Sequence, residues 1–212
     1  FLTLEVAPSR LANALIGVSA MGFCGCMLAP PLQEPAIGLT TSASPAAKFA
    51  GGCNLLECTK DGQLIGHLTL GRGALDSIRL HADPTTANIL LLGTNLLSRS
   101  LALELTLAGT LGITIADPWD AQASVLTDAI NAIEGGNART VEDALTLSYE
   151  SIDIVIATEE NRPLPTEFKL PKFREDLVVV DTSLDPKASS TAAKWPDPCF
   201  TVYRLARIFS PT

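Results

Sequence analysis

The residues best suited to chemistry in this chain follow a short apolar run near its middle. The run, residues 89–92, ends at a glycine, after which the sequence reads Gly93-Thr94-Asn95-Leu96-Leu97-Ser98. A glycine turn between a buried strand and a helix can hold a phosphate group on backbone N–H groups. The complete pattern is Gly-x-Gly-x-x-Gly or Ala, and only its first glycine is present. Gly93, Thr94, Asn95 and Leu96 are therefore predicted to form a dinucleotide-binding turn with an altered phosphate cradle.

An acidic residue, Asp117, stands at the end of the next apolar run, residues 111–116. In mononucleotide-binding units, a carboxylate at this position accepts hydrogen bonds from ribose hydroxyl groups. A carboxylate also repels a 2′-phosphate, so Asp117 favours NAD over NADP. The alternative is that Asp117 caps a helix that begins at Pro118, and the sequence does not decide between these two roles.

Cysteines and a histidine in the first third of the chain are further candidates. Cys24 and Cys26 point to one face of a predicted strand, and Cys53 and Cys58 lie on a predicted hairpin. Four thiolates can bind zinc, but the Cys-x-x-Cys spacing is missing and free cysteines are common core residues, so we predict no metal. His67 could donate a proton, but because no carboxylate neighbour is evident we expect a structural or surface role.

The elements that must position the glycine turn alternate between strands and helices. Unbroken apolar runs predict four buried strands, at residues 89–92, 111–116, 152–157 and 177–180. Helical periodicity predicts three helices, at 95–108, 121–133 and 141–147. Because a strand-helix-strand order implies parallel pairing, residues 84–190 are predicted to form a Rossmann-type parallel-sheet domain. Residues 191–212 are expected to be a C-terminal tail.

Residues 1–83 are predicted to form a separate α/β domain. A strand at 1–6, a helix at 8–21 and a strand at 23–28 predict a parallel pair by the crossover rule. A hairpin follows, because strands at 53–58 and 64–68 flank Asp61-Gly62, a strong turn signal. A helix at 74–81 then leads to Asp83-Pro84, which is predicted to mark the domain boundary.

The composition of the 212 residues excludes several classes of partner. The formal net charge of −8 argues against binding to nucleic acid or to an anionic membrane surface, since both need clustered lysine and arginine. Five cysteines form no compact framework, which favours a reducing, cytoplasmic setting. The start alternates like a strand and has no basic leader, so we expect no signal peptide, and a chain that begins inside a longer polypeptide.

Three further motifs, taken with the glycine turn, give the chain a recognisable order. The segment from Gly22 to Glu34 reads G-F-C-G-C-M-L-A-P-P-L-Q-E, which is similar to G-F-x-G-x-N-V-T-x-P-x-K-E. Gly51-Gly52-Cys53-Asn54 is similar to G-A-V-N, and the segment from Gly66 to Gly73 is similar to G-x-N-T-D-G-x-G. In this order and spacing, residues 1 to 185 resemble the shikimate dehydrogenase family.

The resemblance implies a fold, a reaction and site residues. In this family, an N-terminal domain binds the substrate, a Rossmann domain binds NADP, and 3-dehydroshikimate is reduced to shikimate in the cleft between them. Asn54 and Thr69 match substrate-binding positions. The family's catalytic lysine falls on Gln33 and its partner aspartate falls on Leu70. Glutamine can donate a hydrogen bond but cannot give up a proton at neutral pH, and leucine can do neither.

Other substitutions make the matching pocket less polar, at Met27, Ala29 and Leu68. A polyhydroxy acid would leave buried hydroxyl groups unpaired there, at roughly 1–3 kcal/mol each. We therefore expect a catalytically weak or inactive member with a small-molecule ligand in an interdomain cleft, which binds NAD, NADP or neither. The alternative is an active oxidoreductase, preferring NAD, on a less polar carbonyl substrate. The sequence is compatible with a homodimer and with a part of a larger polypeptide. The family's first strand and helix, and its last helix, have no match in this sequence.

Overall fold

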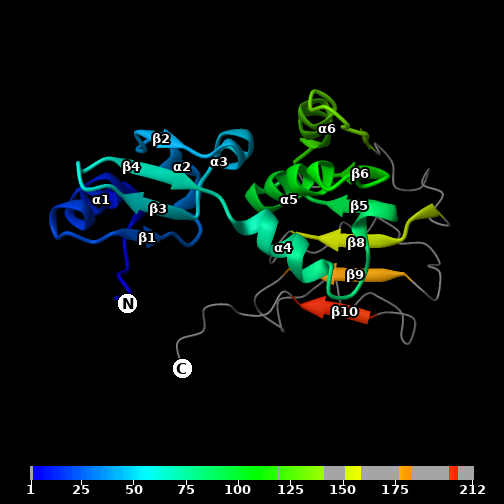
Figure 1. Cartoon of the computed structure of the whole chain (residues 1–212), viewed down its shortest axis with the longest axis horizontal. Coiled ribbons are helices and arrows are strands. Elements are labelled where there is room, and N and C mark those ends of the chain that lie inside the picture. The colour runs from blue at the N-terminus through cyan, green and yellow to red at the C-terminus, as the bar shows by residue number, and fades with distance from the viewer. Residues whose placement is uncertain (1, 119, 141–150, 159–176, 183–200, 205–212) are drawn as a thin grey trace. The chain divides into compact units, whose positions relative to one another are not determined.

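A computed structural model describes residues 2–118, 120–140, 151–158, 177–182 and 201–204, with backbone alone at 181 and 201–204 (Figure 1). The chain divides into two compact units, Phe1–Leu70 and Gly71–Thr212. This division follows the first residue of helix α4 (Leu70–Ile78), whereas the sequence placed the boundary after this helix, at Asp83-Pro84. The helix belongs with the second unit because the Gly71 amide donates to Ser100 Oγ at 2.9 Å. The predicted boundary at 190 lies outside the described residues.

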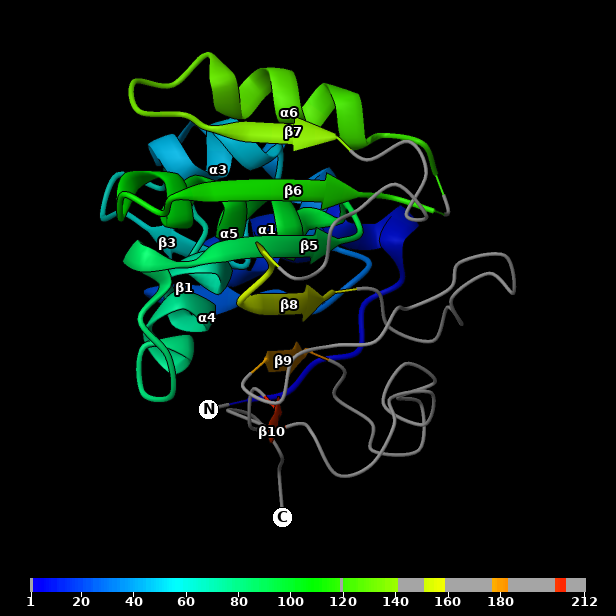
Figure 2. The same ribbon diagram turned by 90° about the vertical axis from the view of Figure 1, so that its right-hand side faces the viewer.

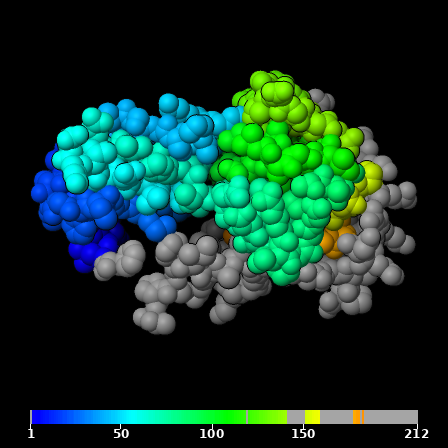
Figure 3. Space-filling view, viewed as in Figure 1, coloured from blue at the N-terminus to red at the C-terminus, as the bar shows by residue number. Residues whose placement is uncertain are grey.

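The first unit contains a four-stranded mixed sheet with the order β1-β3-β4-β2. Its strands are β1 (Gly25–Met27), β2 (Ser42–Ala43), β3 (Leu55–Cys58) and β4 (Leu64–His67). The predicted hairpin is confirmed, since β3 and β4 pair antiparallel with Leu56 opposite Gly66. Its turn, with Gly62 at a φ of 76°, lies at the surface (Figure 3). Strand β1 pairs antiparallel with β3, and β2 pairs parallel with β4.

The helices of the first unit are η1 (Pro8–Arg10), α1 (Leu11–Ala20), α2 (Gln33–Ile37) and α3 (Pro45–Ala50). The predicted apolar stripe of α1 is confirmed at Leu11, Leu15 and Val18, which are buried. Met21 was predicted on the same stripe, which is wrong, because the helix ends at Ala20 and the Met21 side chain is 63% exposed.

The predicted N-terminal strand is wrong for the part of it that the structure describes, residues 2–6. The predicted parallel pair of residues 1–6 with 23–28 is therefore absent from the described residues as well. The reason is that β1 takes its partner from β3, at long sequence separation, with Cys26 opposite Leu56. An alternating pattern makes a strand only where a neighbouring edge satisfies its backbone groups.

The second unit is built on a six-stranded parallel sheet with the order β10-β9-β8-β5-β6-β7 (Figure 2). The four predicted strands are confirmed as β5 (Asn88–Leu92), β6 (Gly112–Ala116), β8 (Ile154–Ala157) and β9 (Val178–Asp181). Two further strands lie at the edges of this sheet, β7 (Ala138–Thr140) and β10 (Thr201–Arg204). From β5 the chain adds β6 and β7 on one side of that strand, and it then adds β8, β9 and β10 on the other side. The strand order therefore reverses between β5 and β8. Open α/β sheets bind ligands beside such a reversal.

The remaining elements of the second unit are η2 (Pro84–Thr86), α5 (Leu96–Leu107) and α6 (Ala123–Asn131). Helix α5 buries Leu101 and Leu105 completely, as its periodicity predicts. Helix α6 instead buries Leu126 and Ile130, and the predicted face through Val125 is wrong because Val125 is 62% exposed. The predicted helix at 141–147 lies outside the described residues.

Candidate functional site

Two of the predicted substrate-binding residues meet at the open end of the β3–β4 hairpin. Asn54 precedes β3 and Thr69 follows β4, so the antiparallel pairing brings the two together. Asn54 Oδ1 accepts a hydrogen bond from the Thr69 amide at 2.8 Å, and Asn54 Nδ2 donates to Thr69 Oγ1 at 3.0 Å. Asn54 is buried while Thr69 is exposed, so the pair presents a hydroxyl group at the surface of the unit.

The predicted catalytic position Gln33 belongs to the same hydrogen-bonded network. It begins α2, and its Nε2 donates to the Leu28 carbonyl at 2.8 Å. The Leu28 amide in turn donates to the Asn54 carbonyl at 2.8 Å. Leu70 follows Thr69 and begins α4. The structure therefore places Gln33, Asn54 and Thr69 in one network and Leu70 directly after it.

The chemistry of this network is that of neutral donors and acceptors. An amide and a hydroxyl group can orient a polar ligand, but neither exchanges a proton at neutral pH as a general acid must. Glu34 lies next to Gln33 in the first turn of α2, where a negative charge favours the helix dipole. This is the structural role that a carboxylate at a helix N-terminus ordinarily has.

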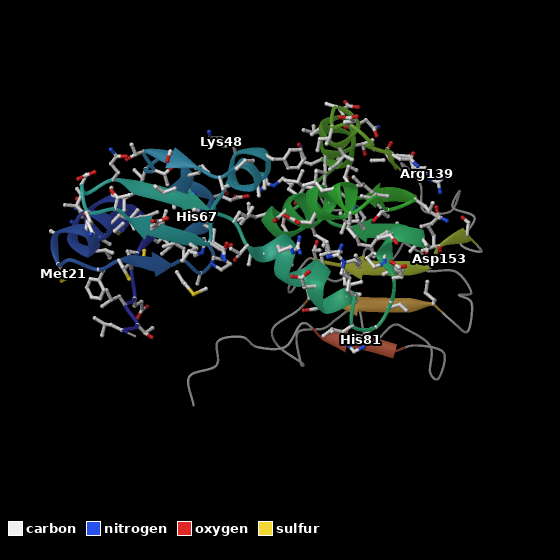
Figure 4. The ribbon with its side chains drawn as sticks, in the orientation of Figure 1. Met21, Lys48, His67, His81, Arg139 and Asp153 are labelled. Atoms are coloured by element: carbon white, nitrogen blue, oxygen red, sulfur yellow. The ribbon has the colours of Figure 1, made fainter. Side chains whose placement is uncertain are left out.

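His67 has a carboxylate neighbour, contrary to the sequence-based expectation. His67, which is labelled in Figure 4, has its Nε2 3.2 Å from Glu57 Oε2 of strand β3, and both side chains are partly exposed. His67 is opposite Leu55 and Glu57 is opposite Ile65, so the two residues are diagonal neighbours on one face of the sheet. The sequence could not reveal this pair because it depends on the register of the hairpin.

Side chains of the glycine turn in the second unit, residues 93–98, form hydrogen bonds with backbone groups in and beside the turn. Gly93 adopts a φ of 100°, and its amide donates to the Ala116 carbonyl at 2.8 Å. Asn95 caps α5, because its Oδ1 accepts from the Ser98 amide at 3.0 Å, and its Nδ2 donates to the Thr158 carbonyl at 2.7 Å. The Ser98 and Thr158 hydroxyl groups also bond to each other.

Thr158 is a residue of this site that sequence reasoning missed. It follows β8, and its Oγ1 donates to the Leu92 carbonyl at 2.9 Å, which joins the carboxyl ends of β5 and β8 at the reversal of strand order. The available signal was its position directly after a buried apolar run, where parallel strands place ligand-binding residues.

Asp117 lies at the carboxyl end of β6 and is held within the protein. One carboxylate oxygen accepts from Thr94 Oγ1, and the other accepts from the Asp120 amide at 3.0 Å. The predicted alternative that Asp117 caps a helix starting at Pro118 is wrong, because α6 starts at Ala123. Ribose binding by Asp117 stays a prediction.

The phosphate cradle does not fit a dinucleotide in the usual way. At two of the three glycine positions of the pattern stand Asn95 and Ser98, and each side chain is bonded within the turn or to Thr158. The Ser98 N–H group, which a bare glycine turn leaves for an anion, is already used by Asn95. A pyrophosphate would have to displace this cap.

Cys24, Cys26, Cys53 and Cys58 are free thiols. Among the described residues, no group of three or more histidine, cysteine or acidic side chains is arranged to hold a metal ion. Burial, followed by the charge of the Cys26 thiolate, raises the pKa of Cys53 to about 11.

In the described part of the chain, no helix has the length and apolar character needed to cross a bilayer.

A mixed-sheet α/β unit followed by a parallel sheet with a glycine turn at its reversal defines a two-unit protein with a Rossmann-type second half. No protein-family model matches the chain. It is 33% identical over 189 residues to the shikimate dehydrogenase (NADP(+)) of Methanococcoides burtonii, covering 86% of this chain and 66% of the relative. It is 30% identical over 142 residues to that of Streptococcus equi subsp. zooepidemicus, covering 66% of this chain and 47% of the relative.

A solved structure has the same fold. The crystal structure of shikimate 5-dehydrogenase from Listeria monocytogenes, in complex with shikimate and NAD, aligns with a TM-score of 0.75 and 20% identity, covering 95% of this chain and 74% of that one. The chain belongs to the shikimate dehydrogenase family of NAD(P)-linked oxidoreductases. It spans about half the length of the Streptococcus relative, 47%.

Proposed function

We propose that this chain is a catalytically weak or inactive member of its family that retains a small-molecule site. The observation that carries the proposal is the state of Gln33. It stands at the family's lysine position, and its Nε2 donates to the Leu28 carbonyl at 2.8 Å. The Gln33 side-chain amide has a structural role because it donates to a backbone carbonyl, and it has no proton to release at neutral pH.

The lack of a proton donor at residue 33 would impair the reaction itself, because reduction of a ketone needs a proton as well as a hydride. The family reaction converts the carbonyl oxygen of 3-dehydroshikimate into a hydroxyl group, and a positioned acid accelerates such a step by about 10²–10⁴-fold. Gln33 cannot supply this proton, and Leu70, at the position of the partner aspartate, has no polar side-chain atom. The Asn54–Thr69 pair can still orient a polar ligand.

Dinucleotide binding is proposed to be weak and, where it occurs, selective for NAD. The Asp117 carboxylate disfavours a 2′-phosphate, while the Asn95 cap competes with any anion for the Ser98 N–H group. The free thiols of the described residues support a reducing, cytoplasmic setting. Self-association into a homodimer, or a place in a larger polypeptide, is open to test by light scattering of the purified chain.

A second candidate is a working oxidoreductase that acts on a less polar carbonyl compound. The His67–Glu57 pair favours it, since a carboxylate at 3.2 Å can orient the imidazole ring for proton transfer to a substrate. The apolar side chains of Met27 and Leu68, where the family motif has asparagine, would suit such a substrate. His67 would then be the donor, and Gln33 would be dispensable for turnover.

Oxidation of NADH and NADPH with 3-dehydroshikimate and a panel of carbonyl compounds separates the two candidates. For the weak enzyme, we expect Gln33→Lys with Leu70→Asp to raise turnover of 3-dehydroshikimate at least tenfold. The matched control Gln33→Asn keeps an amide and should not raise the turnover of 3-dehydroshikimate. Wild-type turnover of 3-dehydroshikimate that Gln33→Ala abolishes would refute the first proposal. Turnover of another carbonyl compound that His67→Asn abolishes, but Gln33→Ala preserves, would establish the second.

A thermal-shift series with NAD, NADP and shikimate tests ligand binding apart from catalysis. A ligand that binds the folded chain and not the unfolded chain raises the melting temperature, by an amount that grows with the ratio of its concentration to its Kd. We expect shikimate or NAD, at millimolar concentration, to give a small upward shift that exceeds the shift with NADP. The absence of a shift with all three ligands would refute both the retained ligand site and the cofactor assignment.

A further inference from the structure

Strands β1 and β3 are neighbours in the sheet of the first unit (Figure 1), and Cys24 and Cys58 lie opposite each other where their ladder begins. Gly25 pairs with Glu57 and Cys26 pairs with Leu56, so the next pair along the antiparallel register is Cys24 with Cys58. The Cys58 amide donates to the Cys24 carbonyl at 2.9 Å, which extends the ladder to this pair. Side chains of directly opposed residues point to the same face of a sheet.

The two strands approach each other closely beside this pair. A Cβ atom added at Gly25 would lie 2.2 Å from the Leu56 carbonyl oxygen, so glycine is needed between Cys24 and Cys26. Directly opposed residues of antiparallel strands have Cα atoms about 4.5–5.5 Å apart. Disulfides span Cα separations of about 4.4–6.8 Å. Cys24 and Cys58 form a hydrogen-bonded pair, whose Cα atoms are about 5.5 Å apart in an antiparallel ladder, so their Cα separation is within the range that a disulfide spans.

The thiols also influence each other's ionisation. Burial, and then the charge of the Cys24 thiolate, raises the pKa of Cys58. Burial, and then the charge of the Cys58 thiolate, raises the pKa of Cys26. Cys24 is exposed while Cys53 is fully buried. An oxidant in solution therefore reaches Cys24 first, and Cys58 is the neighbour best placed to resolve the product.

We propose that Cys24 and Cys58 form a thiol-oxidation site, which closes as a reversible cross-strand disulfide on reaction with a low-molecular-weight disulfide. The Cys24 thiolate attacks one sulfur of the oxidant, which gives a mixed disulfide and releases one thiolate. The Cys58 thiolate then attacks the Cys24 sulfur and releases the second thiolate. The two cysteines are oxidised, the oxidant is reduced to two thiols, and the protons of Cys24 and Cys58 pass to them through solvent.

The bond would fasten the segment that leads to the Gln33 network. Strand β1 continues into Leu28, whose amide donates to the Asn54 carbonyl and whose carbonyl accepts from Gln33. A link from β1 to β3 restrains this segment without touching Asn54 or Thr69. The proposal concerns thiol chemistry alone, so it stands whether or not the chain binds a dinucleotide.

Peptide mapping after oxidation tests the proposal directly. The full chain, carrying Cys199→Ser, is treated with oxidised glutathione, blocked with iodoacetamide and digested with trypsin. Cys24 and Cys26 lie in the peptide spanning residues 11–48, and Cys53 and Cys58 lie in the peptide spanning 49–60. We expect these peptides to be linked, and to separate on reduction with dithiothreitol. We also expect the melting temperature of the oxidised chain to rise by on the order of 5–10 °C.

Single substitutions identify the bonded pair. The link should persist in Cys26→Ser, which is the matched control on the same strand, and should vanish in Cys24→Ser and Cys58→Ser. A link that survives in Cys24→Ser would overturn the assignment, as would unlinked peptides in a chain whose exposed thiol has reacted with the glutathione reagent. Cys24 is exposed, so Cys24→Ser should fold normally, and its unoxidised melting temperature checks this.

Discussion

Replacing Asn95 with glycine should weaken the second unit while making the α5 N-terminus more accessible to an anion. The substitution removes the bond from Asn95 Nδ2 to the Thr158 carbonyl at 2.7 Å and the cap on the Ser98 amide at 3.0 Å. A hydrogen bond of this kind contributes about 0.5–1.5 kcal/mol, and glycine replaces an asparagine cap at a cost of a few tenths. We therefore expect Asn95→Gly to lower the free energy of unfolding by roughly 1–2 kcal/mol.

The same change should strengthen binding of NAD. Glycine removes the Cβ atom and the amide from the turn, and it leaves the Ser98 N–H group without its side-chain acceptor. One hydrogen bond from such a group to a charged ligand contributes about 1.5–3 kcal/mol, and about 1.4 kcal/mol is tenfold in Kd. We expect the Kd for NAD to fall at least tenfold. Asn95→Ala is the matched control, since it removes the same bonds but keeps a Cβ atom.

Urea denaturation measures the stability of both variants, and isothermal titration with NAD measures affinity. The alanine variant should be the less stable of the two, by about 1 kcal/mol, because alanine is a poor N-cap. Its affinity for NAD should gain less than that of the glycine variant. The reasoning fails if Asn95→Gly keeps wild-type stability within about 0.5 kcal/mol, or if the two variants bind NAD equally well.

Three further predictions follow from buried contacts. Gly71→Ala would place a Cβ atom 2.3 Å from the Ser100 carbonyl carbon and should cost about 1–3 kcal/mol by thermal denaturation, whereas Gly73→Ala, with nothing within 4 Å, should be neutral or stabilising. Asn54→Leu should cost roughly 1–3 kcal/mol, because it removes two hydrogen bonds to Thr69 that contribute about 0.5–1.5 kcal/mol each. Because burial raises the pKa of Cys53 from 9.0 to about 11, stability should fall by about 2–3 kcal/mol as pH rises between these values, and Cys53→Ala should flatten that slope.

The second unit could be predicted from sequence to a large extent. Its strands β5, β6, β8 and β9 contain runs of buried, mainly apolar residues, at 89–92, 113–116, 154–157 and 179–180, and such runs are visible without knowledge of their partners. The edge strand β7 was not predicted, and the sequence around β10 was compatible with either a strand or a helix, because edges carry mixed side chains and little periodicity. In the first unit, residues 2–6 have a strand pattern but form no strand, since pairing and not alternation decides.

The sequence by itself determined the family, the hairpin at Asp61-Gly62 and the glycine turn, because these depend on local residue order. Tertiary structure alone decided that His67 meets Glu57, that Asn95 and Ser98 reach Thr158, and that Cys24 faces Cys58. Each of these contacts joins side chains from different strands or from strand ends. Strand register and strand order set such contacts, and both are fixed by the packing of the whole sheet, which no local pattern encodes.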